Sequence, residues 1–169
     1  MPYTNVMADK NKYEKKAVLD TFKIMYSVEI EISRLYSAFA GQFPEDSGFW
    51  KKISSDEVVH GDNIKRIFAL LSENDLEYTI GKAFSLKAGS LMLENVRLYI
   101  NDTEEKLLTK KNTLVIARDL ENCLLEAKYM DYLITDHKEY NDFIKLIVKE
   151  TTQHKALIEK KLKESNLGV

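Results

Sequence analysis

The sequence predicts an all-α protein, an up-down-down-up four-helix bundle with one long crossover that contains a short helix. Four segments repeat apolar side chains at alternating steps of three and four residues, as helices do when one face meets a core. Only two prolines and six glycines occur in 169 residues, so little interrupts these segments. A long connection, residues 73–111, can carry the chain from one end of the bundle to the other.

The first helix is predicted from about residue 12 to a turn at residues 44–48, where Pro44 and Gly48 interrupt the helical pattern. Its stripe contains one charged residue and consists of Val18, Phe22, Met25, Glu29, Ile32, Tyr36, Phe39 and Phe43. The second helix follows this turn, and its stripe consists of Trp50, Ile53, Glu57, His60, Ile64, Ile67 and Leu71. Both helices therefore turn ionisable side chains toward the predicted core.

The crossover contains an apolar stretch at residues 84–100, which is predicted to form one short helix or two lying across the bundle. The third helix begins near Asn112, and its stripe consists of Leu114, Ala117, Glu121 and Leu124. After a polar turn at residues 136–140, the fourth stripe consists of Ile144, Ile147, Thr151, His154, Ile158 and Leu162. Proline, glycine and serine never cluster, so one domain is expected over residues 1–169, with the bundle at 12–163.

The two halves of the bundle look like a duplicated helical hairpin. Phe49, Ile53, Glu57, His60 and Ile64 superimpose without gaps on Phe143, Ile147, Thr151, His154 and Ile158. Upstream, Glu29 precedes Tyr36 by seven residues. In the second half, Glu121 precedes Tyr129 by eight. Counted from the two turns at a rise of about 1.5 Å per residue, the polar side chains of the four stripes can share one layer.

Composition and charge exclude several function classes. The net charge is −2 and the lysines are scattered among acids, which argues against a nucleic-acid partner. No apolar stretch reaches membrane-spanning length and the first residues lack a signal-peptide core, so we expect a cytoplasmic protein without membrane contact. Cys123 is the only cysteine, so neither an intrachain disulfide nor a Cys-x-x-Cys metal knuckle is expected. We expect its thiol to be buried and inert.

The glutamates and histidines on the apolar stripes are candidate metal ligands. A buried carboxylate or imidazole costs several kcal/mol unless it is compensated, and a metal ion bound between helices is a known compensation. The candidate ligands are Glu29, Glu57, His60, Glu121 and His154. Mixed carboxylate and imidazole sites suit iron, manganese or zinc. In the alternative no metal binds, and the glutamates are protonated or hydrogen-bonded to the two histidines and to Tyr36.

These residues resemble the ferritin-like dimetal-carboxylate superfamily, most closely its rubrerythrin-type four-helix bundles, over residues 12–163. The resemblance rests on Glu29 with Tyr36 seven residues later, on the Glu57-x-x-His60 motif, on the crossover and on a second hairpin that ends in a core histidine. It implies that Glu29 is a terminal ligand of one metal, that Glu57 is a bridging carboxylate and that His60 is a terminal imidazole.

The resemblance also assigns roles in the second half. It implies that Glu121 and His154 are the second-half terminal ligands and that Tyr36 is a hydrogen-bond donor beside the ligands. Thr151 departs from the pattern, because it stands where the second Glu-x-x-His motif should have glutamate. Glu150 is adjacent but lies about 100° round the helix. One bridging carboxylate is therefore missing, so we expect one ion, or two with a weaker second.

The resemblance implies an oxidoreductase that acts on peroxide or dioxygen through iron or manganese, with a role in oxidative stress. Rubrerythrins also carry a small iron site built from two Cys-x-x-Cys knuckles. This chain has nothing of that kind, so the electron donor is expected to be another protein. A homodimer is the expected assembly. The alternative is a metal-free or single-metal helical bundle with an interaction, regulatory or iron-handling role and no catalysis.

Overall fold

The computed structural model describes residues 3–73, 76–81, 86–126 and 129–166, and this part of the chain is helical apart from short connections. The all-α prediction is therefore confirmed. In chain order the elements are α1 (Tyr3–Gln42), the 3₁₀ helix η1 (Pro44–Asp46), α2 (Ser47–Glu73), β1 (Thr79–Ile80), α3 (Leu86–Glu104), α4 (Lys110–Glu126), α5 (Tyr129–Tyr132), β2 (Leu133–Ile134) and α6 (Lys138–Asn166). Within the described ranges, no helix combines the length and the apolar character needed to cross a membrane.

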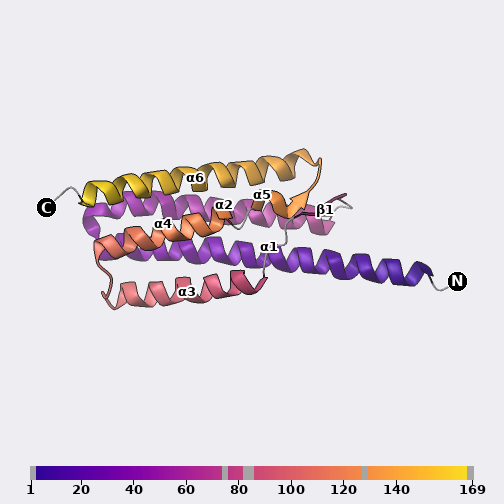
Figure 1. Cartoon of the computed structure of the whole chain (residues 1–169), viewed down its shortest axis with the longest axis horizontal. Coiled ribbons are helices and arrows are strands. Elements are labelled where there is room, and N and C mark those ends of the chain that lie inside the picture. The colour runs from indigo at the N-terminus through magenta and orange to yellow at the C-terminus, as the bar shows by residue number, and fades with distance from the viewer. Residues whose placement is uncertain (1–2, 74–75, 82–85, 127–128, 167–169) are drawn as a thin grey trace.

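The helices α1, α2, α4 and α6 lie along one another (Figure 1). Helix α2 packs against α1, α6 packs against α4, and α2 also contacts α6. In Figure 1, α1 and α6 run toward the same end of the molecule, whereas α2 and α4 run the opposite way. The first turns of α1 extend beyond the other helices. This arrangement lets side chains from all of these helices meet in one central layer.

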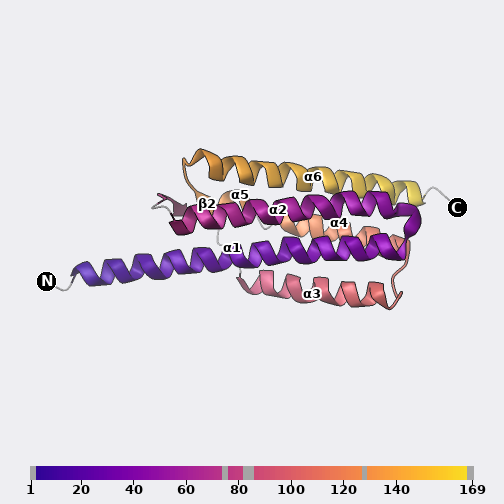
Figure 2. The same ribbon diagram turned by 180° about the vertical axis from the view of Figure 1, so that it is seen from behind.

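The crossover differs from the prediction. We expected one short helix or two lying across the bundle, but α3 is a single helix of 19 residues. It runs alongside α1 and packs on it (Figure 2). The physical reason is the spacing of its buried residues, which form a stripe along the whole helix and not one short contact. These residues are Gly89, Leu93, Val96 and Thr103.

A pair of two-residue strands, which the sequence did not predict, joins the crossover to the segment before α6. Strands β1 and β2 are antiparallel, with Thr79 opposite Ile134. Gly81 follows β1, and its N–H donates to the carbonyl of Tyr132 at 2.9 Å. A Cβ atom on Gly81 would lie 2.0 Å from the carbonyl oxygen of Asp131, so only glycine fits this close approach. Strands this short show no alternation that a sequence pattern could reveal.

Aromatic side chains fill the core where α1 turns into α2. Trp50 is buried, and its ring centroid lies 5.0 Å from that of Phe39, 5.6 Å from that of Tyr36 and 4.9 Å from that of Phe49. Aromatic pairs at these separations are favourable beyond the area they bury. The cluster fixes the ring of Tyr36, so its hydroxyl is held in place for the polar layer next to it.

Cys123 is exposed, and the prediction of a buried thiol was wrong. The neighbouring Ile116 and Leu120 suggested a covered face on α4. Helix α3 packs on α1, however, and leaves a groove between α3 and α4 that these three residues help to line. Partial burial and the carboxylates of Glu126 and Asp119 raise the pKa of the thiol. Its nucleophilic thiolate form is therefore disfavoured.

Asp46 ties the turn between α1 and α2 to the second hairpin. Its buried carboxylate forms ion pairs with Nζ of Lys110, at the start of α4, and with Nζ of Lys161, near the end of α6, both at 2.6 Å. Burial alone would raise the pKa of Asp46, but the two neighbouring lysines lower it. One carboxylate therefore holds three parts of the bundle together.

Replacing Asp46 with asparagine should destabilise the protein by about 1–2 kcal/mol, because its buried carboxylate loses ion pairs with two lysines that are themselves partly exposed. Urea denaturation measures this difference. Because the folded pKa lies below the unfolded value of about 3.9, the difference is full above about pH 4 and shrinks as the pH falls through the folded pKa. The control is Glu45→Gln at an exposed neighbour, which should change stability by less than about 0.5 kcal/mol. Equal losses in both variants would contradict this role for Asp46.

Candidate metal centre

The five residues that the sequence singled out lie together inside the bundle. Glu29 comes from α1, Glu57 and His60 from α2, Glu121 from α4 and His154 from α6, and all five are buried. In the described part of the chain, two groups of side chains could hold a metal ion: Glu29, Glu57 and His60, and Glu57, Glu121 and His154. Within each group, one possible ligand atom from each residue lies within 4.8 Å of the others. Glu57 belongs to both groups.

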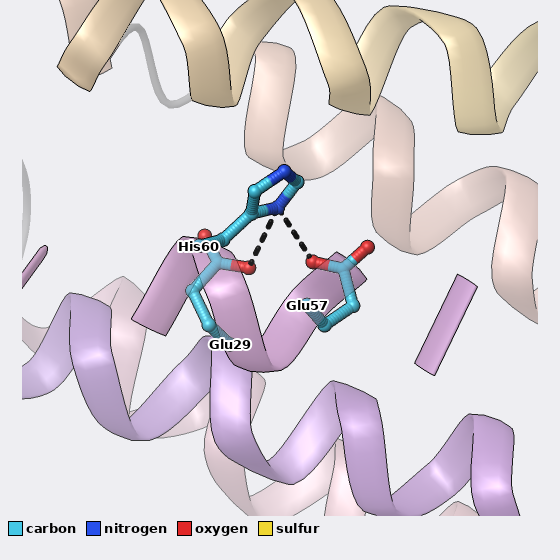
Figure 3. Close-up of side chains that lie close together, drawn as sticks. All are labelled: Glu29, Glu57 and His60. Atoms are coloured by element: carbon cyan, nitrogen blue, oxygen red, sulfur yellow. Dashed lines mark hydrogen bonds and ion pairs between the residues drawn. The ribbon is translucent and has the colours of Figure 1, made fainter. Parts of the chain in front are cut away.

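Glu29, Glu57 and His60 form the first half-site (Figure 3). Nδ1 of His60 lies 3.0 Å from Oε2 of Glu57 and 3.9 Å from Oε2 of Glu29. The local sequence explains the first contact, because residues three apart share one face of a helix. Glu29 reaches the same point from the neighbouring α1. Two adjacent helices therefore present two carboxylates and an imidazole to one position.

The second half-site mirrors the first. Nδ1 of His154 lies 2.8 Å from Oε1 of Glu57 and 3.9 Å from Oε1 of Glu121. Glu57 thus presents one carboxylate oxygen to each histidine, and the rings of His60 and His154 stack with centroids 5.6 Å apart. The hydroxyl of Tyr36 donates to Oε1 of Glu121 at 2.8 Å. Tyr36 is therefore a hydrogen-bond donor to one of the candidate ligands.

Each histidine is also held from outside by a carboxylate of the other hairpin. Nε2 of His60 lies 3.0 Å from Oε2 of Glu150. Nε2 of His154 lies 3.2 Å from Oδ2 of Asp56. Outer carboxylates of this kind fix the ring orientation and decide which nitrogen is free to bind a metal. In both half-sites the Nδ1 atom is the one that faces the centre.

Asp56 was not predicted as a site residue, and Glu150 was considered only as a replacement for the missing bridging carboxylate. Both residues lie about 100° from the core stripe of their helix, where an acidic side chain is usually solvated. Glu150 instead contacts the outer nitrogen of His60. The signal that could have found both is the repeat itself, in which an acidic residue precedes each of the aligned positions 57 and 151.

Thr151 is buried on α6, at the position that the repeat aligns with Glu57. The centre therefore contains three carboxylates among its candidate ligands, those of Glu29, Glu57 and Glu121. Two divalent ions carry four positive charges, so one charge would need a hydroxide or another anion to balance it. The side chain of Tyr129, which the repeat aligns approximately with Tyr36, lies outside the described residues.

Burial and mutual charge shift the pKa values in this layer. Burial, together with the charge of Glu57, raises the pKa of Glu29 and of Glu121 well above the usual range. Burial alone would also raise the pKa of Glu57, but the imidazoles of His154 and His60 hold it at about 2. Burial would lower the pKa of His60, whereas its neighbouring carboxylates raise it. One ionised carboxylate therefore lies between two that resist ionisation unless a cation is near.

Several buried ligand atoms lack a hydrogen-bond partner among the described residues. Neither carboxylate oxygen of Glu29 accepts a hydrogen bond, and nor does Oε2 of Glu121. Oε1 of Glu57 and Nδ1 of His154 are 2.8 Å apart without the geometry of a hydrogen bond. Leaving such a group unsatisfied costs about 1–3 kcal/mol. A cation in this layer would satisfy all of these atoms together, so the residues fit a metal.

The chain matches no protein-family model, and neither a curated protein nor a solved structure matches it. The candidate ligand atoms are carboxylate oxygens and imidazole nitrogens, a set that suits iron, manganese or zinc.

Proposed function

We propose that this chain is a ferritin-like metal-binding protein whose centre holds one or two iron or manganese ions and reduces peroxide or dioxygen. The directions of α1, α2, α4 and α6 are those of an up-down-down-up bundle with one crossover, which supports the ferritin-like part of the proposal (Figure 1). The site lies between the helices of the bundle, where such metal centres are built.

The proposal rests on the central position of Glu57, which belongs to both half-sites. Each of its carboxylate oxygens faces the Nδ1 atom of a different histidine, and a further glutamate completes each half-site. A carboxylate placed in this way can bridge two ions. Glu29 and His60 would be the terminal ligands of one ion, and Glu121 and His154 those of the other.

The protein's own residues prepare the site for a small substrate. Iron or manganese bound here would exchange electrons with peroxide or dioxygen, whereas zinc would not. Because the candidate ligands are buried, bulk water and large substrates are excluded from the site. Burial and the nearby charge of Glu121 raise the pKa of Tyr36, so its hydroxyl keeps its proton and orients the carboxylate of Glu121.

Reduction of peroxide to two water molecules consumes two electrons and two protons. The single cysteine of this chain cannot build a Cys-x-x-Cys electron carrier. The proposal therefore includes an external electron donor.

A metal-free or single-metal bundle, with an interaction, regulatory or iron-handling role, is the second candidate. Its support is the hydrogen bond between Nδ1 of His60 and Glu57 at 3.0 Å, together with the contact of Nε2 with Glu150. These contacts satisfy His60 without a cation. They leave both carboxylate oxygens of Glu29 without a hydrogen bond, which favours the metal-binding proposal.

Anaerobic calorimetric titration of the metal-free protein with iron(II), repeated with manganese(II), tests the proposal. Glu29→Gln should weaken binding at the first half-site by at least about tenfold, because a neutral amide replaces a charged ligand. The matched control is Glu31→Gln on the same helix. Glu31 pairs with Arg34 and Arg97 outside the cluster, so this variant should bind as the parent does. Equal binding by the parent and Glu29→Gln would contradict the metal site.

The rate of peroxide consumption by the iron-loaded protein with a chemical reductant then separates an enzyme from a metal-binding protein. The parent and Glu31→Gln should consume peroxide at similar rates, and Glu29→Gln should be slower. A parent protein that binds iron but consumes peroxide no faster than free iron would contradict the enzymatic part alone.

A further inference from the structure

The crossover helix α3 presents a face that no other described helix covers. It packs on α1 through Leu93 and Val96. On the opposite face, Leu91 and Leu98 are 55% and 59% exposed, which places them among the most exposed large apolar side chains of the described chain. They are seven residues apart and so lie on one line along the helix. Exposed leucines at this spacing are typical of a helix that packs against another helix.

Charged residues extend this line in both directions. This face, which we call the α3 stripe, consists of the exposed residues Lys87, Leu91, Glu94 and Leu98 and the half-buried Asp102. At 100° per residue, these positions fall within about 80° of one another round the helix. Lys87 lies near the beginning of α3 and Asp102 near its end, so the stripe is basic at one end and acidic at the other.

We propose that the α3 stripe is the contact surface of a homodimer, in which α3 packs antiparallel to α3 of a second copy. In a twofold interface every contact occurs twice. A twofold axis between residues 94 and 95 places Leu91 opposite the partner's Leu98. The same axis places Lys87 opposite the partner's Asp102.

The pairing is favourable along the whole stripe. Leucine meets leucine, a cation meets an anion, and Glu94 meets the amide of the partner's Asn95. A parallel arrangement in register would instead place Lys87 against Lys87 and Glu94 against Glu94, which is unfavourable. A surface for a different protein has no need to be complementary to itself. The charge pattern therefore favours a second copy of this chain as the occupant.

The groove beside the stripe gives the partner helix further apolar surface to cover. Met92 and Tyr99 from α3 line this groove, together with Ile116 and Leu120 from α4. A helix packed against Leu91 would lie along its rim. Since α3 supplies none of the candidate metal ligands, the dimer does not depend on the proposed metal site.

Sedimentation velocity on the full chain over a range of concentrations tests the dimer. The parent should sediment as a dimer, and the double variant Leu91→Glu with Leu98→Glu as a folded monomer with an unchanged helical circular-dichroism spectrum. The control is Leu157→Glu on α6, where a leucine of similar exposure lies away from the stripe, and it should remain dimeric. A parent that is monomeric at its highest soluble concentration, or a double variant that remains dimeric, overturns the proposal.

A charge exchange tests the antiparallel register without removing apolar surface. Lys87→Glu should raise the dimer dissociation constant about tenfold, because two attractive pairs become repulsive. Adding Asp102→Lys reverses both partners of each pair and should return the dissociation constant to within about threefold of the parent value. A double variant that is weaker than Lys87→Glu overturns this register.

Disulfide cross-linking tests the antiparallel register independently. In a Cys123→Ser background, a mixture of Leu91→Cys and Leu98→Cys proteins should form a disulfide-linked heterodimer under mild oxidation. Each variant alone should cross-link much less. Efficient self-cross-linking of Leu91→Cys, without the mixed product, would overturn the antiparallel arrangement.

Discussion

A Glu57→Leu variant should unfold at a lower temperature than the parent when iron(II) or manganese(II) is present, and the difference should shrink when a chelator removes the metal. Binding to the folded state alone stabilises a protein by about 2.7 kcal/mol when the free metal is a hundredfold above its dissociation constant. For a chain of this size, that corresponds to a shift of about 5–10 °C in the melting temperature. The Glu57→Leu variant should lose all of this metal-linked stabilisation, because Glu57 faces both half-sites.

The expected result with chelator is different, because two effects oppose each other. Without Glu57, His60 and His154 lose a partner at 3.0 Å and 2.8 Å. Their outer nitrogens keep the contacts with Glu150 and Asp56. At the same time, the variant removes a buried charge that raises the pKa of neighbouring carboxyls. We therefore expect the metal-free parent and variant to differ by less than about 1 kcal/mol.

The matched control is Glu31→Leu, which makes the same chemical change outside the cluster. This variant loses its ion pairs with Arg34 and Arg97, and the loss should be equal with metal and with chelator. Differential scanning calorimetry of the three proteins in both conditions gives the comparison. A Glu57→Leu protein that melts above the parent in both conditions would establish a metal-free polar network and end the enzyme hypothesis.

The residues of the centre could be predicted because each one interrupts an apolar stripe. Glu29, Glu57 and His60 stand at positions where a helical period of three and four requires a core side chain, and such an exception needs a compensating partner. The repeat then pointed to the second half of the site. Sequence periodicity is informative here because the side chains that meet in the centre all lie on the faces that define the period. Their role as metal ligands stays a prediction.

The other features depend on how helices rotate and pack, which periodicity does not determine. The buried residues of α3, such as Leu93 and Val96, show that one face of the helix has a partner, but they do not identify α1 as that partner. Cys123 is exposed for the same reason, because α3 packs on α1 and does not cover α4. Asp56 and Glu150 lie off the core stripes, so their contacts depend on how far α2 and α6 are turned about their own axes.

A Thr151→Glu variant should raise the metal stoichiometry toward two, because Thr151 stands where a second bridging glutamate is expected. In the parent, the ion held by Glu29, Glu57 and His60 should bind more tightly than the ion on the side of Thr151 and His154. A fourth carboxylate at residue 151 would balance the charge of two divalent ions and supply the missing bridge. We expect the weaker ion to bind at least about tenfold more tightly in the variant.

Without metal, the Thr151→Glu variant should be less stable than the parent. Thr151 is buried, so a glutamate there adds a fourth carboxyl to a layer in which two carboxyls already have raised pKa values. Without a cation this should cost about 1–3 kcal/mol of stability. The control is Thr152→Glu, at an exposed neighbouring position that should affect neither quantity. Titration with manganese(II) gives the stoichiometry, and urea denaturation with chelator gives the stability. If Thr151→Glu and the parent bound metal with the same stoichiometry and affinity, the interpretation of Thr151 as a lost bridging ligand would be wrong.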